Sequence, residues 1–180
     1  MTIIEELYTL KHVNRWNGVC NKGIDTTALH SYFVTCISGF LADIYNETST
    51  IPINKEQVLM HALYHDVAEI HLTHITYGAK KESNILEEEV SNLKKKKFFE
   101  WCKRINRMDL INDIENYKSI KDIIDFADIV DACMYCKEEV DNGNKFMQEI
   151  YKRQKETLMK SIEKYIWAKR FYFDYLLDIL

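Results

Sequence analysis

The segment Ala62-Leu63-Tyr64-His65-Asp66-Val67-Ala68-Glu69 places three side chains with ligand-type atoms in an otherwise apolar helical stretch. Upstream, Asn54 and Gln57 have the spacing of a capping box, which marks the start of a helix. Apolar residues then recur at helical spacing, so the pattern predicts a helix from residue 54 to about residue 70. Because histidine and carboxylate side chains are rarely buried without partners, we expect the end of this helix to form part of a site.

Helical spacing of apolar residues continues along most of the chain. Only five glycines and one proline, Pro52, occur, which leaves little of the turn chemistry that a many-stranded sandwich or barrel requires. Residues 25–27 offer N-cap oxygens for a second helix, and residues 141–144 carry a C-cap signal. Further helices are expected at about residues 3–14, 27–44, 84–102, 109–116, 119–140 and 146–180, with loops at 15–24 and 71–81. We therefore predict an all-α, single-domain helical bundle spanning residues 1–180.

The composition is that of a folded domain without a general affinity for polyanions. A length of 180 residues with 47% apolar and 29% charged side chains excludes a disordered chain and a disulfide-stapled miniprotein. A net charge of −4 argues against a nucleic-acid polymer as partner, and we expect the lysine run at residues 94–97 to be solvated. No apolar run reaches the roughly 18 residues of a membrane helix, and the first residues lack a signal-peptide pattern. We expect a cytoplasmic protein with no membrane partner.

The cysteine pattern fits the same compartment. The five cysteines are odd in number and lie mostly within apolar helical patterns, as expected of reduced thiols: Cys20, Cys36, Cys102, Cys133 and Cys136. The last two form a CxxC motif inside an apolar helical run, with no second CxxC to complete a zinc site. We interpret this pair as core packing, with a zinc or redox role as the alternative.

Two further residues can join the histidine and carboxylates at the end of the helix. Neighbouring residues on a helix diverge by about 100°, but His65 and Asp66 can both reach a metal ion that lies off the helix flank. Glu69 lies one turn beyond His65 and could reach a water molecule on that ion. A bundle could add His30 from the second helix and Asp128 from the long helix. Two imidazoles and two carboxylates suit Mn, Co, Fe, Zn or Mg, with positions left open for water and substrate.

The order and approximate spacing of these residues resemble the HD-domain metal-dependent phosphohydrolases, which are named after the His-Asp pair. The wider pattern resembles the YfbR-like 5′-deoxynucleotidases from about residue 7 to residue 150. The landmarks that carry this resemblance are Asn14-Arg15-Trp16, His30-Ser31, the segment 62–69, Lys80-Lys81 and Ala127-Asp128.

The resemblance implies an all-helical bundle that removes the 5′-phosphate from deoxynucleoside monophosphates. It assigns the divalent metal to His30, His65, Asp66 and Asp128, with Asp128 preferred over Asp122, Asp125 and Asp131 because an alanine precedes it. Glu69 would activate or orient the attacking water, and Arg15 would clamp the phosphate and neutralise growing charge. Trp16 would pack against the sugar or base, and Lys80 and Lys81 could bind phosphates.

Two departures from the family pattern bear on the substrate. Leu29 precedes His30 where the family usually has glutamate, and Thr73-His74-Ile75-Thr76 stands where the family usually reads Gly-Asp-Leu-Pro. His74 therefore either replaces that aspartate as a polar contact to substrate or signals a different nucleotide preference. Because some related phage enzymes resemble dNTP triphosphohydrolases, release of triphosphate is the alternative reaction. A metal-binding sensor without turnover and a helical interaction protein are the non-catalytic alternatives.

The remaining histidines and the C-terminal segment have less specific readings. His61 lies four residues before His65 but lacks the neighbouring glutamate of a zinc-protease motif, so we expect it to pack or lie at the surface. His71 and His74 should border the site and could bind a second metal ion. The aromatic segment 146–180 is either core cover or a subunit interface, and its tyrosines and tryptophan favour a homo-oligomer, with a dimer as the first expectation.

Overall fold

The computed structural model describes residues 2–72, 84–112 and 117–180, and within these ranges the regular secondary structure is helical, with no strand. Their one extended pairing is an isolated antiparallel bridge between Asn14 and Thr26. The prediction of an all-α fold is therefore confirmed. None of the described helices is both long and apolar enough to cross a bilayer.

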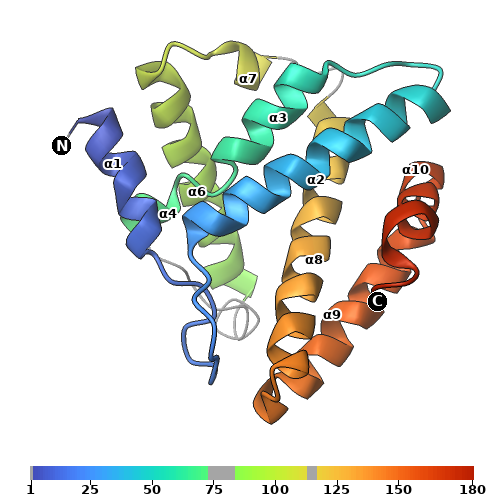
Figure 1. Ribbon diagram of the computed structural model, residues 1–180. Helices are drawn as coiled ribbons and strands as arrows, with labels where there is room; N and C mark the ends of the chain where they lie inside the picture. Colours follow the sequence, from blue (N-terminus) through green and yellow to red (C-terminus); the bar gives the residue numbers. More distant parts are fainter. Residues whose placement is uncertain (1, 73–83, 113–116) are drawn as a thin grey trace.

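Three helices form the centre of the bundle, as Figure 1 shows: α2 (Thr27–Thr48), α3 (Lys55–Tyr64) and α8 (Tyr117–Asp141). Both predicted N-caps are present. The Thr26 side chain accepts a hydrogen bond from the Leu29 amide, and the Asn54 side chain accepts hydrogen bonds from two amides of the first turn. The apolar faces of the three helices meet in one core. Its largest fully buried members include Val34, Leu41, Val58, Ile120, Ile123, Phe126 and Val130.

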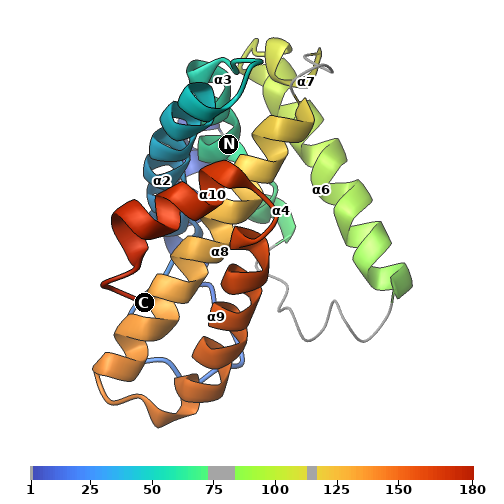
Figure 2. The ribbon, with the colours of Figure 1, turned by 90° about the vertical axis from the view of Figure 1, so that its right-hand side faces the viewer.

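The expected long C-terminal helix is broken, which corrects the prediction for residues 146–180. A short 3₁₀ turn, η2 (Lys145–Met147), leads into α9 (Gln148–Ile162), which packs along α8. The chain becomes extended at Tyr165, and α10 (Ile166–Phe171) with η3 (Tyr172–Leu176) then lies across α2 (Figure 2). The break allows Trp167 and Phe171 to set their rings edge-to-face against Phe126.

The helix that carries the His-Asp pair ends earlier than the sequence predicts. Helix α3 ends at Tyr64, residues 65–68 form a turn, and α4 (Glu69–Leu72) starts at Glu69. Two backbone hydrogen bonds hold the turn. The Val67 amide donates to the Tyr64 carbonyl at 3.0 Å, and the Glu69 amide donates to the Asp66 carbonyl at 2.9 Å. The expectation of a continuous helix to residue 70 is wrong. At residues 65–69 backbone hydrogen bonds to the third preceding residue replace those to the fourth preceding residue that an α-helix requires.

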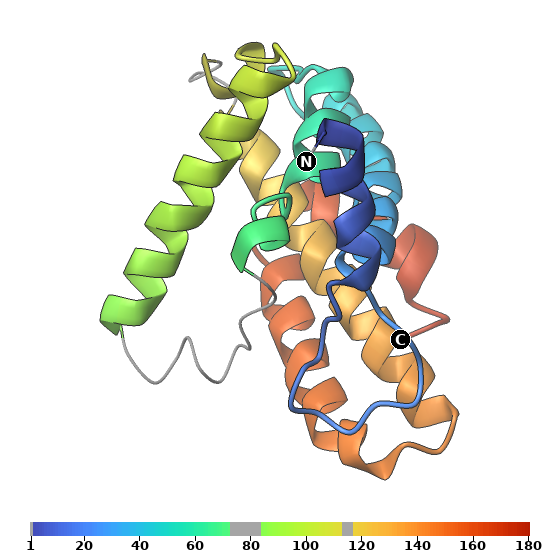
Figure 3. The same cartoon turned by 90° about the vertical axis from the view of Figure 1, so that its left-hand side faces the viewer.

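The remaining described elements flank this centre. Helix α1 (Ile3–Thr9) and η1 (Leu10–His12) lie beside α4, and α6 (Asn84–Arg104) stands on the other side of α4 in Figure 3, followed by α7 (Asp109–Asn112). An ion pair of 2.6 Å between Arg104 Nη1 and Glu6 Oε2 ties α6 to α1. Helix α6 therefore faces the turn that follows α3.

All five cysteines carry free thiols. Cys133 and Cys136 of α8 are fully buried, and burial raises the pKa of their thiols to about 11 and about 12. The CxxC pair therefore packs in the core, as its apolar helical surroundings in the sequence predict.

Candidate metal centre

Three side chains from three different elements converge on one point. His30 lies on α2, His65 begins the turn after α3, and Asp128 lies on α8, with their ligand atoms all within 4.8 Å of one another. The two Nε2 atoms are 3.1 Å apart, and the Nε2 of His30 is 3.1 Å from Asp128 Oδ1. His30 is buried, whereas the Asp128 side chain is 48% exposed, so solvent can reach the cluster from the side of α8.

Each imidazole is oriented by a bond from its other nitrogen. His30 Nδ1 lies 2.6 Å from Asp131 Oδ2, and His65 Nδ1 lies 2.7 Å from the Ala62 carbonyl oxygen. An imidazole whose Nδ1–H donates to an oxygen presents its Nε2 lone pair to a metal ion. Asp131 therefore positions His30. In the sequence Asp131 is only a rival of Asp128, although its place three residues further on the same helix face indicates this contact.

The ionised carboxylate of Asp128 and the two imidazoles form a set of ligand atoms for a cation. Burial favours neutral His30, but the bonds to Asp128 and Asp131 outweigh it and raise its pKa to about 9. Loss of hydration works to raise the pKa of Asp128, but the hydrogen bond and charge of His30 and the charge of Arg15 hold this pKa well below the usual range. Imidazole nitrogens and carboxylate oxygens in this number suit Zn²⁺, Mn²⁺, Fe²⁺ or Co²⁺. The residues present therefore fit a divalent metal ion.

Asp66 divides its two carboxylate oxygens between the cluster and a lysine. Its Oδ2 lies 3.5 Å from His65 Nε2 and 3.8 Å from His30 Nε2, whereas its Oδ1 accepts a bond of 2.8 Å from Lys94. Burial works to raise the pKa of Asp66, but the charges of His65 and Lys94 hold it far below its usual range. Because the chain turns at residues 65–68, both His65 and Asp66 face the cluster despite being neighbours in sequence.

Glu69 is buried near Asp66 and Lys94, and a hydrogen bond holds each of its carboxylate oxygens. Its Oε2 accepts a bond of 2.8 Å from the Thr27 hydroxyl, and its Oε1 accepts a bond of 3.0 Å from Lys94 Nζ. Its side chain is 1% exposed, so these contacts fix a carboxylate next to the cluster.

Lys94 corrects the expectation that the lysine run is solvated. Its ammonium contacts Asp66 and Glu69, and their charges outweigh burial and raise its pKa well above the ordinary value. Lys95 and Lys96 are exposed, and Lys97 pairs with Glu100 at 2.8 Å on the same helix. Helix α6 brings Lys94 to Asp66 and Glu69, which lie 28 and 25 positions earlier in the chain. No local sequence pattern encodes contacts over such separations.

Arg15 approaches the same cluster from the loop before α2. Its buried guanidinium lies 3.2 Å from Asp131, 3.6 Å from Asp25 and 3.7 Å from Asp128. Among the described residues, its Nε has no hydrogen-bond partner although it is buried. A buried, unpaired donor beside a metal cluster can donate to an anion that binds there.

Trp16 is fixed in a conformation that few residues adopt. Its φ of 59° lies in the left-handed region, its indole N–H donates to Asp25 Oδ2 at 2.8 Å, and its ring stacks on Tyr135 at 5.3 Å. One face of the indole is thus covered by protein.

The other sequence candidates are placed as follows. His74, Lys80 and Lys81 lie outside the described residues. His71 is exposed on α4. His61 is buried and packs against Phe98 at 5.7 Å and Tyr117 at 5.9 Å between ring centroids, which is the packing role expected of it.

The comparison with protein families identifies this arrangement. A model described as "5'-deoxynucleotidase YfbR-like" matches residues 2–177. The chain belongs to the YfbR-like 5′-deoxynucleotidase family. This membership confirms the resemblance seen in the sequence and, with the cluster of His30, His65 and Asp128, makes the protein a metal-dependent hydrolase.

Curated relatives of this YfbR-like protein include a phosphatase and a 5′-deoxynucleotidase. The 4′-phosphooxetanocin A phosphatase of Priestia megaterium is 32% identical over 180 positions, which cover 94% of this chain and 89% of the relative. The 5′-deoxynucleotidase YfbR of Photorhabdus temperata is 26% identical over 158 positions, which cover 84% of this chain and 80% of the relative.

Solved structures support the fold. DatZ, an HD phosphohydrolase of cyanophage S-2L bound to dA and one catalytic Zn²⁺ ion, has a TM-score of 0.72 at 15% identity, with 99% of this chain and 97% of that chain covered. An HD-domain phosphohydrolase of Listeria innocua has a TM-score of 0.72 at 20% identity, with 97% and 85% covered. The YfbR-like protein therefore has the helical bundle of HD phosphohydrolases.

Proposed function

We propose that this protein removes the 5′-phosphate from deoxynucleoside monophosphates, with a divalent metal ion held by His30, His65, Asp66 and Asp128. The observation that carries the proposal is the convergence of two oriented Nε2 atoms and a carboxylate within 4.8 Å. Glu69, Lys94 and Arg15 surround this convergence. The phosphatase and the 5′-deoxynucleotidase among the curated relatives support the choice of a phosphomonoester as substrate.

A divalent ion held by His30, His65, Asp66 and Asp128 would lower the pKa of a bound water molecule and polarise a phosphoryl oxygen. Zinc is the ion in the DatZ structure, and manganese, cobalt, iron and magnesium are the alternatives for this chain.

In this proposal Glu69 acts as the general base. Its carboxylate accepts a proton from the attacking water, whose oxygen forms the new bond to phosphorus while the bond from phosphorus to the 5′-oxygen breaks. The departing 5′-oxygen takes up a proton, so the products are a deoxynucleoside and inorganic phosphate. Thr27 and Lys94 prevent Glu69 from rotating away from the reacting water, because each holds one of its oxygens.

In this proposal Arg15 acts as the phosphate clamp. Its guanidinium lies 3.7 Å from Asp128, and its buried Nε can donate to a phosphoryl oxygen. A guanidinium beside the phosphorus neutralises the charge that grows on the equatorial oxygens.

The test is product analysis of the purified protein with Co²⁺ or Mn²⁺ and deoxynucleoside mono-, di- and triphosphates. Deoxynucleoside and inorganic phosphate from the monophosphates support the proposal. Deoxynucleoside and triphosphate from a dNTP would replace it with the triphosphohydrolase reaction. Bound metal without any product would indicate a sensor.

We also propose that the protein forms a homodimer through an exposed apolar stripe on α2 and η3. Leu29, Tyr32, Phe33 and Phe40 follow one another at helical spacing on α2 and are 44–60% exposed. Tyr175 of η3, 50% exposed, extends the stripe with its ring 5.9 Å from that of Phe40. Light scattering should give twice the chain mass, and Phe33→Glu should shift the protein to monomer, whereas a monomeric wild type would contradict the proposal.

The thiols support the cytoplasm as the place of this activity. Cys102, Cys133 and Cys136 are buried as free thiols, a form that a reducing compartment maintains.

A further inference from the structure

The loop between η1 and α2 brings Arg15 to the metal cluster, and backbone hydrogen bonds close the base of this loop. The Arg15 amide donates to the Asp25 carbonyl at 3.0 Å, and the Thr27 amide donates to the Val13 carbonyl at 2.9 Å. Residues 16–24 lie beyond this closed base. Contacts with another element must therefore fix their conformation.

One face of α8 supplies these contacts. Residues 128, 131, 135 and 139 follow one another at intervals of three or four, which places them on the same side of the helix. The first two contact the Arg15 guanidinium, and Tyr135 stacks its ring on Trp16. Glu139, the last of the four, meets the loop at its far end.

Glu139 is 2% exposed, and its carboxylate binds the loop directly. Its Oε2 accepts a hydrogen bond of 2.8 Å from the Lys22 amide, and its Oε1 accepts one from the Gly23 amide. The Asn144 side chain donates both to Oε2 of Glu139 and to the Cys20 carbonyl. One carboxylate and one carboxamide therefore hold residues 20, 22 and 23 against the end of α8.

The donors around Glu139 require a side chain with two acceptor oxygens. Among the residues that the structure describes, no lysine or arginine side chain forms an ion pair with it, and the Lys22 ammonium donates to the Asn142 carbonyl at 2.9 Å. Burial works to raise the pKa of Glu139, but the bonds from Asn144 and the two amides hold it below its ordinary value. An ionised carboxylate, which only accepts, thus matches a set of N–H donors.

Gly23 permits the close approach of the loop to this carboxylate. A Cβ at residue 23 would lie 2.9 Å from Oε1 of Glu139, which is closer than side-chain atoms pack. The missing side chain allows the Gly23 amide to reach the oxygen. The contact is therefore specified from both sides, by a glycine in the loop and a glutamate on the helix.

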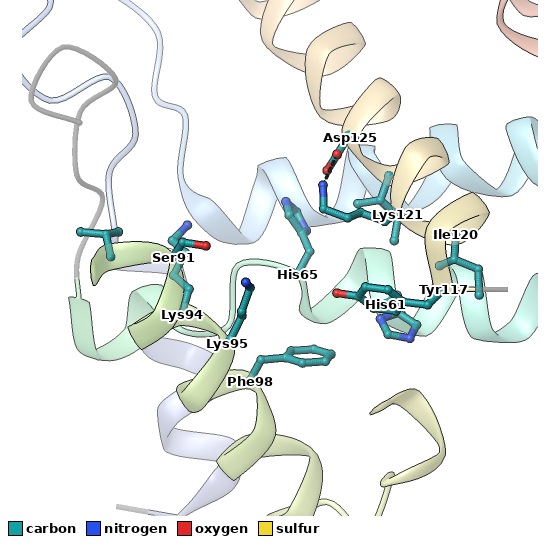
Figure 4. Close-up of a pocket in the computed structure, with 12 residues that line it drawn as sticks. His61, His65, Ser91, Lys94, Lys95, Phe98, Tyr117, Ile120, Lys121 and Asp125 are labelled. Carbon is teal, nitrogen blue, oxygen red and sulfur yellow. Dashed lines mark hydrogen bonds and ion pairs between the residues drawn. The ribbon is translucent and has the colours of Figure 1, made fainter. Parts of the chain in front are cut away.

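Glu139 is remote from the reacting groups. It lies about three turns beyond Asp128, which is roughly 16 Å along the helix axis. The cavity of about 380 Å³ next to His65, shown in Figure 4, is lined on α8 by residues between 120 and 125, and the cavity at the loop is lined by residues between 14 and 25. Glu139 lines neither cavity, so any effect on the reaction must pass through the loop.

We infer that Glu139 is a positioning residue for the proposed reaction, because it holds the loop in the conformation that places Arg15 at the metal cluster. The residue after Arg15 is Trp16, whose φ of 59° persists only where the surrounding structure fixes it. Release of residues 22 and 23 allows Trp16 to return to an ordinary φ, and the peptide that joins it to Arg15 turns with it. The inference rests on the proposed role of Arg15 as phosphate clamp.

The experiment compares Glu139→Gln with the wild type, because the amide keeps the size of the side chain and replaces one acceptor oxygen with a donor. We expect kcat/KM for dAMP to fall about tenfold, with metal affinity unchanged in a chelator competition. Glu138→Gln is the matched control, because Glu138 is the exposed neighbour on α8 and should give the wild-type values.

A double variant distinguishes positioning from a general loss of stability. In Arg15→Met, Glu139→Gln should cause no further loss of kcat/KM, because the group through which it acts is already missing. The same loss in both backgrounds would overturn the inference, and so would wild-type kcat/KM in Glu139→Gln alone. If melting curves show that Glu139→Gln does not fold, Gly23→Ala displaces the same carboxylate from the loop side and carries the same predictions.

Tryptophan fluorescence separates this inference from the proposed reaction. Trp101 and Trp167 are buried, so a change in quenching by acrylamide reports mainly on Trp16. Glu139→Gln should increase the quenching, and Trp16→Phe should abolish this difference, whether or not dAMP is hydrolysed. Quenching equal to that of the wild type would show that Glu139 does not hold the loop.

Discussion

Lys94 Nζ lies 3.0 Å from Glu69 Oε1 and 2.8 Å from Asp66 Oδ1, so one ammonium joins the proposed general base to a proposed metal ligand. The lysine comes from α6, whereas Asp66 lies in the turn after α3 and Glu69 begins α4. The position of the base therefore depends on the docking of a separate helix.

Replacing this lysine should damage turnover more than metal binding. Lys94→Met removes the ammonium that holds Oε1 of Glu69 and keeps the bond of Thr27 to Oε2, so we expect kcat to fall on the order of 10- to 100-fold. Lys94→Arg should restore part of the loss, because it retains the charge and donors. Steady-state kinetics with metal analysis would measure this, with Lys96→Met as the exposed control. Wild-type kcat in Lys94→Met would contradict the positioning role.

Glu69 and His65 should separate chemistry from metal binding. Glu69→Ala should lower kcat by roughly 10²- to 10⁴-fold because the general base is lost, while the metal content stays that of the wild type. His65→Ala should lose both activity and metal, because its Nε2 belongs to the cluster. Elemental analysis of the purified variants measures the metal. Equal metal loss in the two variants would remove Glu69 from the water-activating role.

Asp131 should act through His30. Asp131→Asn keeps the size of the side chain but weakens the 2.6 Å contact with His30 Nδ1, so we expect metal affinity to fall about 10- to 100-fold. Competition with a chelator would measure the affinity. Asp122→Asn is the control, since Asp122 lies on the same helix and pairs with Lys118 at 2.8 Å. An affinity equal to that of the wild type would show that Asp131 does not orient the imidazole.

Metal binding should depend on pH through His30. In the metal-free protein its pKa is raised to about 9, so at pH 7 the imidazole carries a proton that a metal ion must displace. Apparent affinity should therefore rise up to about tenfold per pH unit between pH 7 and pH 9. The same raised pKa stabilises the metal-free fold below the ordinary value of 6.5, and this contribution is lost as pH rises through 9. Chelator competition and thermal unfolding across this range would test both effects, and a flat affinity profile would contradict them.

The sequence predicts much of the fold because its signals are local. The cap residues Thr26 and Asn54 and the helix end at Gly143, where φ is 78°, are encoded by neighbouring residues and occur as expected. The turn at residues 65–68 and the break before α10 were missed, because tertiary packing overrides a continuous helical pattern at both.

The candidate site was only partly predictable for a related reason. The residues of the His-Asp segment are recognisable by order and spacing, whereas Lys94 and Asp131 acquire their contacts only when α6 and α8 pack against the site. Their sequence surroundings, a lysine run and a series of aspartates at helical spacing, are typical of solvated helix faces.

The most direct test of the account is a metal titration of the metal-free protein in the presence of dAMP, with inorganic phosphate as the readout. We predict that phosphate release rises with added Mn²⁺ or Co²⁺, levels off at one bound equivalent per chain, and disappears when a chelator removes the metal. One equivalent of bound metal with no phosphate released would contradict the central claim.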